Sequence, residues 1–162
     1  MASEADKSFD DEFERYLHRM FYIKPTEETS KCDPSIVEFF GVLSLTDMRA
    51  PDRKLWYIYY CKQPEVDDTL NRIFHKYGKK NMCEIFRKPT FSGAGLRARV
   101  KTFFSEKKWH VKGNLLEAPP KNPYNNDRMV RNITNLYDEE RKMLYNYIGM
   151  KHDAFSRYYN YN

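Results

Sequence analysis

The stretch Leu55-Trp-Tyr-Ile-Tyr-Tyr-Cys61 carries no charged residue and consists largely of aromatic and β-branched side chains. Side chains of these kinds favour the extended conformation. A strand that is apolar at every position is typical of one covered on both faces, and such a strand usually lies inside its sheet. The stretch therefore predicts a β-strand near the centre of a sheet.

Helices are predicted on both sides of this strand. After it, Pro64 opens a helix that ends before Gly78, where a residue of positive φ usually terminates a helix. The apolar stripe of this helix consists of Val66, Leu70, Ile73, Phe74 and Tyr77. Before the strand, Asp33-Pro34 is a helix start signal for residues 36–43, although residues 41–45 also suit a strand. A further helix is predicted over residues 9–20.

The second half of the chain predicts more strands and then two helices. Residues 81–87 are expected to be extended, and residues 108–112 are a possible last strand. Apolar and polar residues alternate from Leu96 to Phe104, which predicts a strand with one wet face. Short helices are predicted over residues 127–132 and 137–148. The expected fold class is α+β, with a small, mostly antiparallel sheet of about three to five strands flanked by about five helices.

The length of 162 residues fits one domain. We expect a flexible acidic tail over residues 1–7 and a single globular domain over residues 8–149. The proline-rich segment 118–123 is expected to be a connector inside that domain. Residues 150–162 are rich in tyrosine and are expected to form an exposed tail.

Several protein classes are excluded on composition. Aromatic residues make up 16% of the chain, which argues against bulk disorder. No apolar run approaches the roughly 18 residues of a membrane span, so we expect no membrane contact and an intracellular location, nuclear or cytoplasmic. The cysteines Cys32, Cys61 and Cys83 are odd in number and lack the close spacing of zinc ligands. We therefore expect no disulfide framework, no metal and no cofactor.

The charge of the chain is concentrated in one segment. The net charge of the whole chain is +5. Residues 79–112 contain ten lysines and arginines against Glu84 and Glu106, which gives this segment a net charge of +8. A local excess of this size favours polyanions such as nucleic acid or acidic protein segments.

The strand predicted over residues 96–104 predicts how three of these cations are spaced. Arg97, Arg99 and Lys101 would lie on one face about 7 Å apart in succession, which is close to the phosphate spacing along one nucleic-acid strand. Phe103, Trp109 and His110 would offer flat faces on which unpaired bases stack. The full set of candidate contact residues is Arg87, Lys88, Arg97, Arg99, Lys101, Phe103, Lys107, Lys108, Trp109, His110 and Lys112.

The sequence therefore predicts a non-enzymatic nucleic-acid-binding protein, with RNA or a single strand as the expected ligand. The alternative is a protein-interaction subunit that docks an acidic partner through the same surface. An enzyme without a recognisable motif is the third hypothesis, because no nucleophile or metal-ligand pattern is present. The loop Ser92-Gly-Ala-Gly95 is interpreted as a flexible connector, since a phosphate loop requires a following helix and a strand is expected there.

Overall fold

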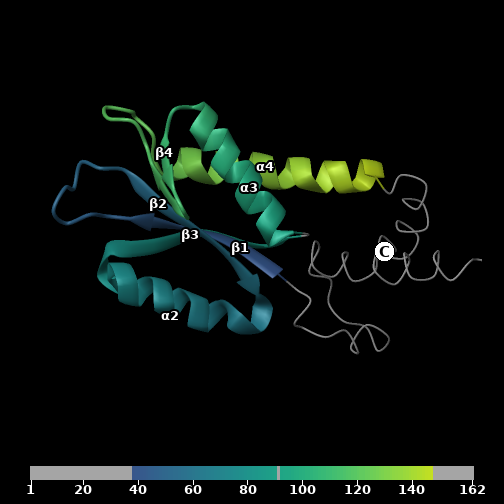
Figure 1. The fold of residues 1–162 in the computed structure, drawn as a ribbon, viewed down its shortest axis with the longest axis horizontal. Helices are drawn as coiled ribbons and strands as arrows, with labels where there is room; N and C mark the ends of the chain where they lie inside the picture. Colours follow the sequence, from purple (N-terminus) through teal and green to yellow (C-terminus); the bar gives the residue numbers. More distant parts are fainter. Residues whose placement is uncertain (1–37, 91, 148–162) are drawn as a thin grey trace, which may run out of the picture.

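Our computed structural model describes residues 38–90 and 92–147 of the chain (Figure 1). The helix predicted over residues 9–20, the helix start at residues 33–34 and the tails predicted over residues 1–7 and 150–162 lie outside these residues.

The described residues form one five-stranded sheet in which every neighbouring pair is antiparallel. Its strands, in chain order, are β1 (Glu38–Leu45), β2 (Leu55–Lys62), β3 (Met82–Thr90), β4 (His110–Lys112) and β5 (Leu115–Glu117). The spatial order is β3-β1-β2-β5-β4, so β2 is the middle strand. This confirms the prediction that the aromatic stretch is a central strand.

Three α-helices pack on this sheet within the described part of the chain, where about five had been predicted for the whole chain. They are α2 (Val66–Tyr77), α3 (Gly93–Glu106) and α4 (Asn126–Tyr147), and two short 3-10 turns, η3 (Gln63–Glu65) and η4 (Lys79–Asn81), precede and follow α2. Figure 1 shows α2 below the sheet and α3 and α4 above it. The α+β fold class is confirmed. None of the described helices has the length and apolar character needed to cross a membrane.

The topology explains why α2 and α3 lie on opposite faces. Strands β2 and β3 both pair antiparallel with β1, so they are parallel to each other, and α2 connects them. Strand β4 is parallel to them as well, and α3 connects β3 at one edge of the sheet to β4 at the other. The two connections therefore run in opposite directions across the sheet. Crossovers between parallel strands are right-handed, so opposite directions require opposite faces.

Each face of the sheet carries its own apolar core. On the α2 side, the core consists of Leu43, Tyr59, Cys61, Val66, Leu70 and Ile73. On the other side, the rings of Trp56, Trp109, Phe104 and Tyr124 form a cluster with centroids 4.4–6.2 Å apart. The indole N–H of Trp56 donates a hydrogen bond to Asn126 Oδ1 at 2.9 Å, which satisfies the polar atom of a buried side chain.

The structure has strand β1 where a helix was predicted over residues 36–43, so that prediction is wrong. Phe40 and Val42 face the α3 side, whereas Leu43 faces α2. A run that is apolar on both faces suits a strand covered by helices on both sides. The alternative of a strand near residues 41–45 is the one that the structure has.

The structure has helix α3 where a strand was predicted over residues 96–104, so that prediction is wrong. Leu96, Val100 and Phe104 are fully buried and are spaced by four residues, as one face of a helix requires. Ser92 caps this helix, because its Oγ accepts a hydrogen bond from the Gly95 N–H at 3.0 Å.

Helix α4 likewise replaces the two short helices predicted over residues 127–132 and 137–148 with one continuous element. Its buried residues Met129, Ile133, Leu136 and Tyr137 continue the apolar stripe through the segment that had been predicted as a break.

Candidate functional site

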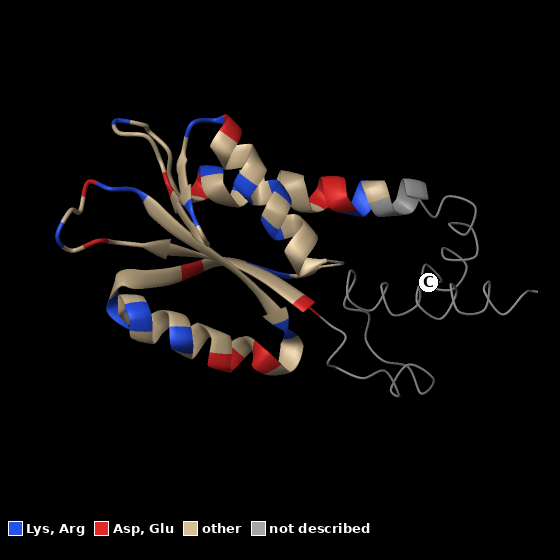
Figure 2. Ribbon diagram, viewed as in Figure 1, with Lys and Arg blue, Asp and Glu red and all other residues tan. Residues whose placement is uncertain are grey.

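Four connectors that are distant in sequence leave the sheet at the same end. Leu45 pairs with both Leu55 and Met82, and Leu55 pairs with Glu117. His110 also pairs with Glu117, so the segment before β4 ends there too. The connectors are residues 46–54, 78–81, 107–109 and 118–125. We call the surface formed by these four connectors the basic loop end; it lies at the left of Figures 1 and 2.

The basic loop end carries a large excess of positive charge. Its cations are Arg49, Arg53, Lys54, Lys79, Lys80, Lys107, Lys108 and Lys121, and its acidic residues are Asp47 and Asp52. Eight cations and two anions give a net charge of +6. Figure 2 shows blue segments in each of the loops at this end. Separate parts of the sequence thus contribute to one positively charged surface.

Two of these cations are held by other groups. Arg53 binds Asp47 at 3.0 Å and Glu117 at 2.7 Å, so its charge is compensated. The hydrogen bond to Glu117 is the main cause that raises the pKa of Arg53, and the same bond lowers the pKa of the Glu117 carboxyl. Lys54 Nζ donates a hydrogen bond to the Asn122 carbonyl at 2.8 Å.

The other six cations form no ion pair with any residue in the described ranges. They are Arg49, Lys79, Lys80, Lys107, Lys108 and Lys121, and all six are exposed. Exposed cations without a counter-ion raise the local positive potential, which attracts anionic ligands.

A cavity of about 500 Å³ opens at this end, between the β1–β2 connector and α2. Leu45, Leu55 and Leu115 contribute apolar surface to it. Its charged lining residues are the cations Arg49, Arg53 and Lys76 and the anion Asp47. Met48 also lines the cavity, and 74% of its surface is exposed. The basic loop end therefore combines a cationic surface with a hollow whose lining is partly apolar and partly charged.

The structure divides the predicted contact residues among several places. Lys107 and Lys108 lie at the basic loop end, and His110 and Lys112 are exposed on the edge strand β4. Lys101, predicted to lie in a row with Arg97 and Arg99, is half-buried on α3. Arg87 and Lys88 are exposed on β3, at the opposite edge of the sheet, where Arg87 pairs with Glu84 at 2.6 Å. Lys88 Nζ lies 5.6 Å from the centre of the Phe86 ring.

The row of cations predicted for residues 97–101 does not form, because α3 is a helix. Residues two apart on a helix point roughly 200° apart, so Arg97 and Arg99 lie on different sides. Arg97 donates a hydrogen bond to Asn114 Oδ1, in the turn before β5. Arg99 pairs with Glu139 of α4 at 2.8 Å. Both guanidinium groups are thus engaged within the protein.

Two of the predicted base-stacking side chains are covered. Trp109 is 6% exposed and lies between the rings of Phe104 and Tyr124, with centroids at 4.4 and 4.7 Å. Phe103 packs on Phe104, and Lys107 Nζ lies 4.4 Å from its ring centre. Trp109 therefore has no free face for a base, whereas Phe103 is half-buried. Trp109 belongs to the core instead.

The prediction that Ser92-Gly-Ala-Gly95 is a flexible connector before a strand is wrong, because Gly93–Gly95 are the first residues of α3 and Ser92 is its N-cap. The protein's own groups nevertheless occupy the amides at this helix start. Gly93 N–H donates to Glu38 at 3.2 Å, and Ser92 N–H donates to Glu140 at 3.4 Å. Two carboxylates thus sit where an external anion would bind. Burial raises the pKa of the Glu140 carboxyl.

Within the ranges that the structure describes, no three His, Cys, Asp or Glu side chains lie together in a way that could hold a metal ion. Comparisons of the chain with protein-family models, with curated proteins and with solved structures found no match.

Proposed function

We propose that the protein is a non-enzymatic binding protein whose basic loop end contacts the phosphate backbone of a nucleic acid. One observation carries this proposal: four connectors that are separate in sequence bring a net charge of +6 together at one end of the fold. Six of the cations there have no ionic partner among the described residues. Neutralisation of phosphates by such cations releases counter-ions and supplies most of the affinity in sequence-independent binding.

The side chains at this end favour phosphate contacts over the reading of bases. Five of the six unpaired cations are lysines, which bind phosphate as flexible point charges. Trp109, which would have stacked on bases, is buried, and Phe103 is half-buried with Lys107 against its ring. Contacts to the backbone position a protein on nucleic acid but carry no sequence information. We therefore expect weak dependence on base sequence.

A salt series with charge variants tests the proposal. Binding of fluorescein-labelled 20-nucleotide oligo(U) and of a 20-base-pair DNA duplex would be measured by anisotropy. In such a series, log K falls with log[salt] by about 0.7 per phosphate contacted on a single strand and about 0.9 on duplex DNA. The double variant Lys107→Ser/Lys108→Ser should therefore reduce the slope by about 1.4 to 1.8. The variant Lys79→Ser/Lys80→Ser, from another connector, should give a similar and additive loss.

The matched control is Lys62→Ser/Lys142→Ser. Both lysines are exposed, and they lie on β2 and α4 away from the basic loop end. This control removes the same net charge, so it should leave the slope nearly unchanged. Equal losses in the control and the two test variants would refute a localised binding surface. No measurable binding of either oligonucleotide at low salt would refute the proposal itself.

The cavity beside Met48 favours a second candidate function, the docking of an acidic protein partner at the same end. A hollow of about 500 Å³ whose lining includes three leucines and has more cations than anions suits a peptide that combines an apolar side chain with carboxylates. Purification of the protein with its partners, with and without nuclease treatment, separates the two functions. Under the first function nuclease removes the partners, and under the second they remain and Met48→Ser weakens their binding.

A further inference from the structure

Strand β2 is paired along only part of one side. Its register with β1 extends over all eight residues, from Leu55 to Lys62. Its register with β5 covers only Leu55–Tyr57, and one more hydrogen bond joins Ile58 N–H to the Asn114 carbonyl at 2.9 Å. Beyond that bond β5 has ended, and among residues 38–90 and 92–147 no other strand pairs with β2 on this side.

The backbone groups of residues 59–62 are oriented for pairing with an added strand. In an antiparallel sheet, the N–H and C=O groups of alternate residues point to alternate sides of the strand. Since Ile58 N–H points away from β1, the N–H and C=O of Tyr60 point the same way, as does Lys62 N–H. No strand within the described part of the chain pairs with them. Tyr60 is also one of the few large apolar residues that are exposed, at 41%.

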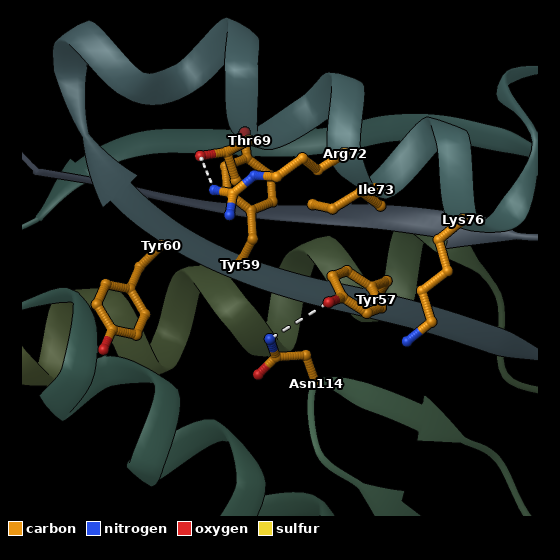
Figure 3. Close-up of a pocket in the computed structure, with 8 residues that line it drawn as sticks. All are labelled: Tyr57, Tyr59, Tyr60, Thr69, Arg72, Ile73, Lys76 and Asn114. Atoms are coloured by element: carbon orange, nitrogen blue, oxygen red, sulfur yellow. Dashed lines mark hydrogen bonds between the residues drawn. The ribbon is translucent and has the colours of Figure 1, made fainter.

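The free edge borders a cavity of about 300 Å³. In Figure 3, Arg72, Ile73 and Lys76 extend from α2 on one side of β2, while Asn114 lies on the other side. Arg72 and Lys76 are cations, and no aspartate or glutamate lines the cavity. The slot beside β2 is therefore positively charged.

Neighbouring groups hold the two ends of this slot in place. Asn114 accepts a hydrogen bond from Arg97 and donates one to Tyr57 Oη at 3.4 Å, so its side chain is fixed at the point where β5 ends. At the other end, Gly93 packs directly on Tyr60: a Cβ added to Gly93 would lie 2.6 Å from Tyr60 Cβ. Because these contacts already fix the edge before a ligand binds, binding does not carry the entropic cost of ordering it, and this favours affinity.

We propose that an extended acidic segment of a partner protein binds this edge as an added strand, continuing the sheet where β5 ends. Strand addition derives its affinity from main-chain hydrogen bonds and its specificity from pockets for alternate side chains. Residues 59–62 span about 14 Å at ~3.4 Å per residue, which matches a segment of about four or five residues. Arg72 and Lys76 select carboxylates on the side chains that face α2. This inference concerns the open edge of β2 rather than the four connectors of the basic loop end, although Lys76 lines the cavity at each place.

N-methylated peptides test this geometry without changing the protein. The probe is the peptide acetyl-Glu-Val-Glu-Val-Glu-amide, and its binding to the full chain is followed by titration of the amide NMR signals. One matched variant carries N-methyl groups on both Val residues, and the other carries them on the second and third Glu residues. Because alternate N–H groups face the strand, one pattern should lose at least tenfold in affinity while the other retains binding. The Tyr60 amide should shift and become protected from hydrogen exchange.

Protein variants supply the second arm. Tyr60→Pro removes the N–H that faces the free edge, and proline is tolerated where a strand's N–H points away from its neighbours. Tyr60→Ala is its matched control, because it removes the ring and keeps the N–H. We expect Tyr60→Pro to lose peptide binding and Tyr60→Ala to retain most of it, with circular dichroism to verify that both fold. Arg72 lines this cavity and not the one at the basic loop end, so Arg72→Glu should weaken binding of this acidic peptide at least tenfold through this site.

Three results would overturn the proposal. The first is equal binding of both N-methylated peptides, which would show that the peptide does not pair as a strand. The second is an absence of binding at millimolar peptide. If the Tyr60 amide is already protected from hydrogen exchange in the free full-length chain, the chain itself covers the edge. If this amide becomes protected only when the chain self-associates, a second copy covers the edge. The third is a shift of the Tyr60 amide signal upon addition of oligo(U) rather than of the peptide.

The variant Lys107→Ser/Lys108→Ser separates this site from the basic loop end, because peptide binding at the β2 edge should be retained in it.

Discussion

Gly41 on β1 allows the ring of Tyr59 to cross the neighbouring strand, and an alanine there should break that arrangement. A Cβ at position 41 would lie 2.3 Å from both Cε1 and Cζ of Tyr59 and 2.5 Å from its Oη. Carbon atoms in contact normally stay about 3.5–4.0 Å apart, so the ring must move by more than 1 Å. Tyr59 is 3% exposed, and its hydroxyl donates a hydrogen bond to Glu84 at 3.2 Å.

The expected cost follows from these contacts. Overpacking of a core costs about 1–3 kcal/mol, and loss of the hydrogen bond to Glu84 adds about 1 kcal/mol. We therefore expect Gly41→Ala to lower the free energy of unfolding by about 2–4 kcal/mol, measured by urea denaturation. At about 2–4 °C per kcal/mol for a chain of this size, Tm should fall by roughly 5–15 °C.

A double-mutant cycle isolates the contact. Leucine lacks Cε1, Cζ and Oη, so in a Tyr59→Leu background Gly41→Ala should cost less than about 1 kcal/mol, since alanine itself suits a strand better than glycine. Phenylalanine keeps Cε1 and Cζ, so in a Tyr59→Phe background the alanine should remain costly. An equal cost in the leucine and wild-type backgrounds would refute this reasoning and show that Tyr59 is not what limits position 41.

Three further predictions concern stability. Burial raises the pKa of the Glu140 carboxyl, so protonation of Glu140 favours the folded state, and the wild type loses stability as the pH rises through that raised pKa. The Tm of Glu140→Gln minus that of the wild type should therefore widen from acid to neutral pH, and a constant difference would contradict the raised pKa. Ser92→Ala removes the cap of α3 and should cost about 1 kcal/mol in urea denaturation, and an unchanged midpoint would mean that the cap contributes nothing. Trp109→Ala should cost about 3–5 kcal/mol, while Trp109→Phe should fold and bind oligo(U) with wild-type affinity; weaker binding by a folded Trp109→Phe would restore a stacking role for this ring.

The sequence predicts most reliably the elements whose pattern allows one structure. The stretch 55–61 is apolar at every position and too short for a typical helix, so it is identified correctly as the central strand. The helix opened by Pro64 is also correct, with α2 beginning at Val66 and Gly78 adopting a φ of +90° at its end. In both cases local propensity and tertiary contacts agree.

The segment 96–104 shows why the remainder is harder. Leu96, Val100 and Phe104 satisfy a two-residue repeat and a four-residue repeat at once, so periodicity alone supports both a strand and a helix. The deciding residues are Ala98 and Thr102, which a strand would bury and which α3 exposes. Which side chains of α3 are buried depends on its packing against β1 and β2, and this tertiary packing cannot be read from a single sequence.

The candidate site was partly visible in the sequence. The dense basic segment 79–112 includes Lys79, Lys80, Lys107 and Lys108, which do lie at the basic loop end. Arg49 and Lys121 lie outside that segment and were missed. Charge density along a chain finds only neighbours in sequence, whereas the sheet register brings these connectors together from positions more than 70 residues apart.

Helix α3 has a consequence for the order in which the chain folds. It links the two outermost strands, β3 and β4, and it contacts β1, β2, β4 and α4. The β1–β2 and β4–β5 hairpins close short loops and can form early, because short loops cost little entropy to close. The two hairpins join where β2 pairs with β5, and α3 spans from β3 at one edge of the sheet to β4 at the other. Such non-local contacts form slowly, so we expect the step that joins the hairpins under α3 to limit the folding rate.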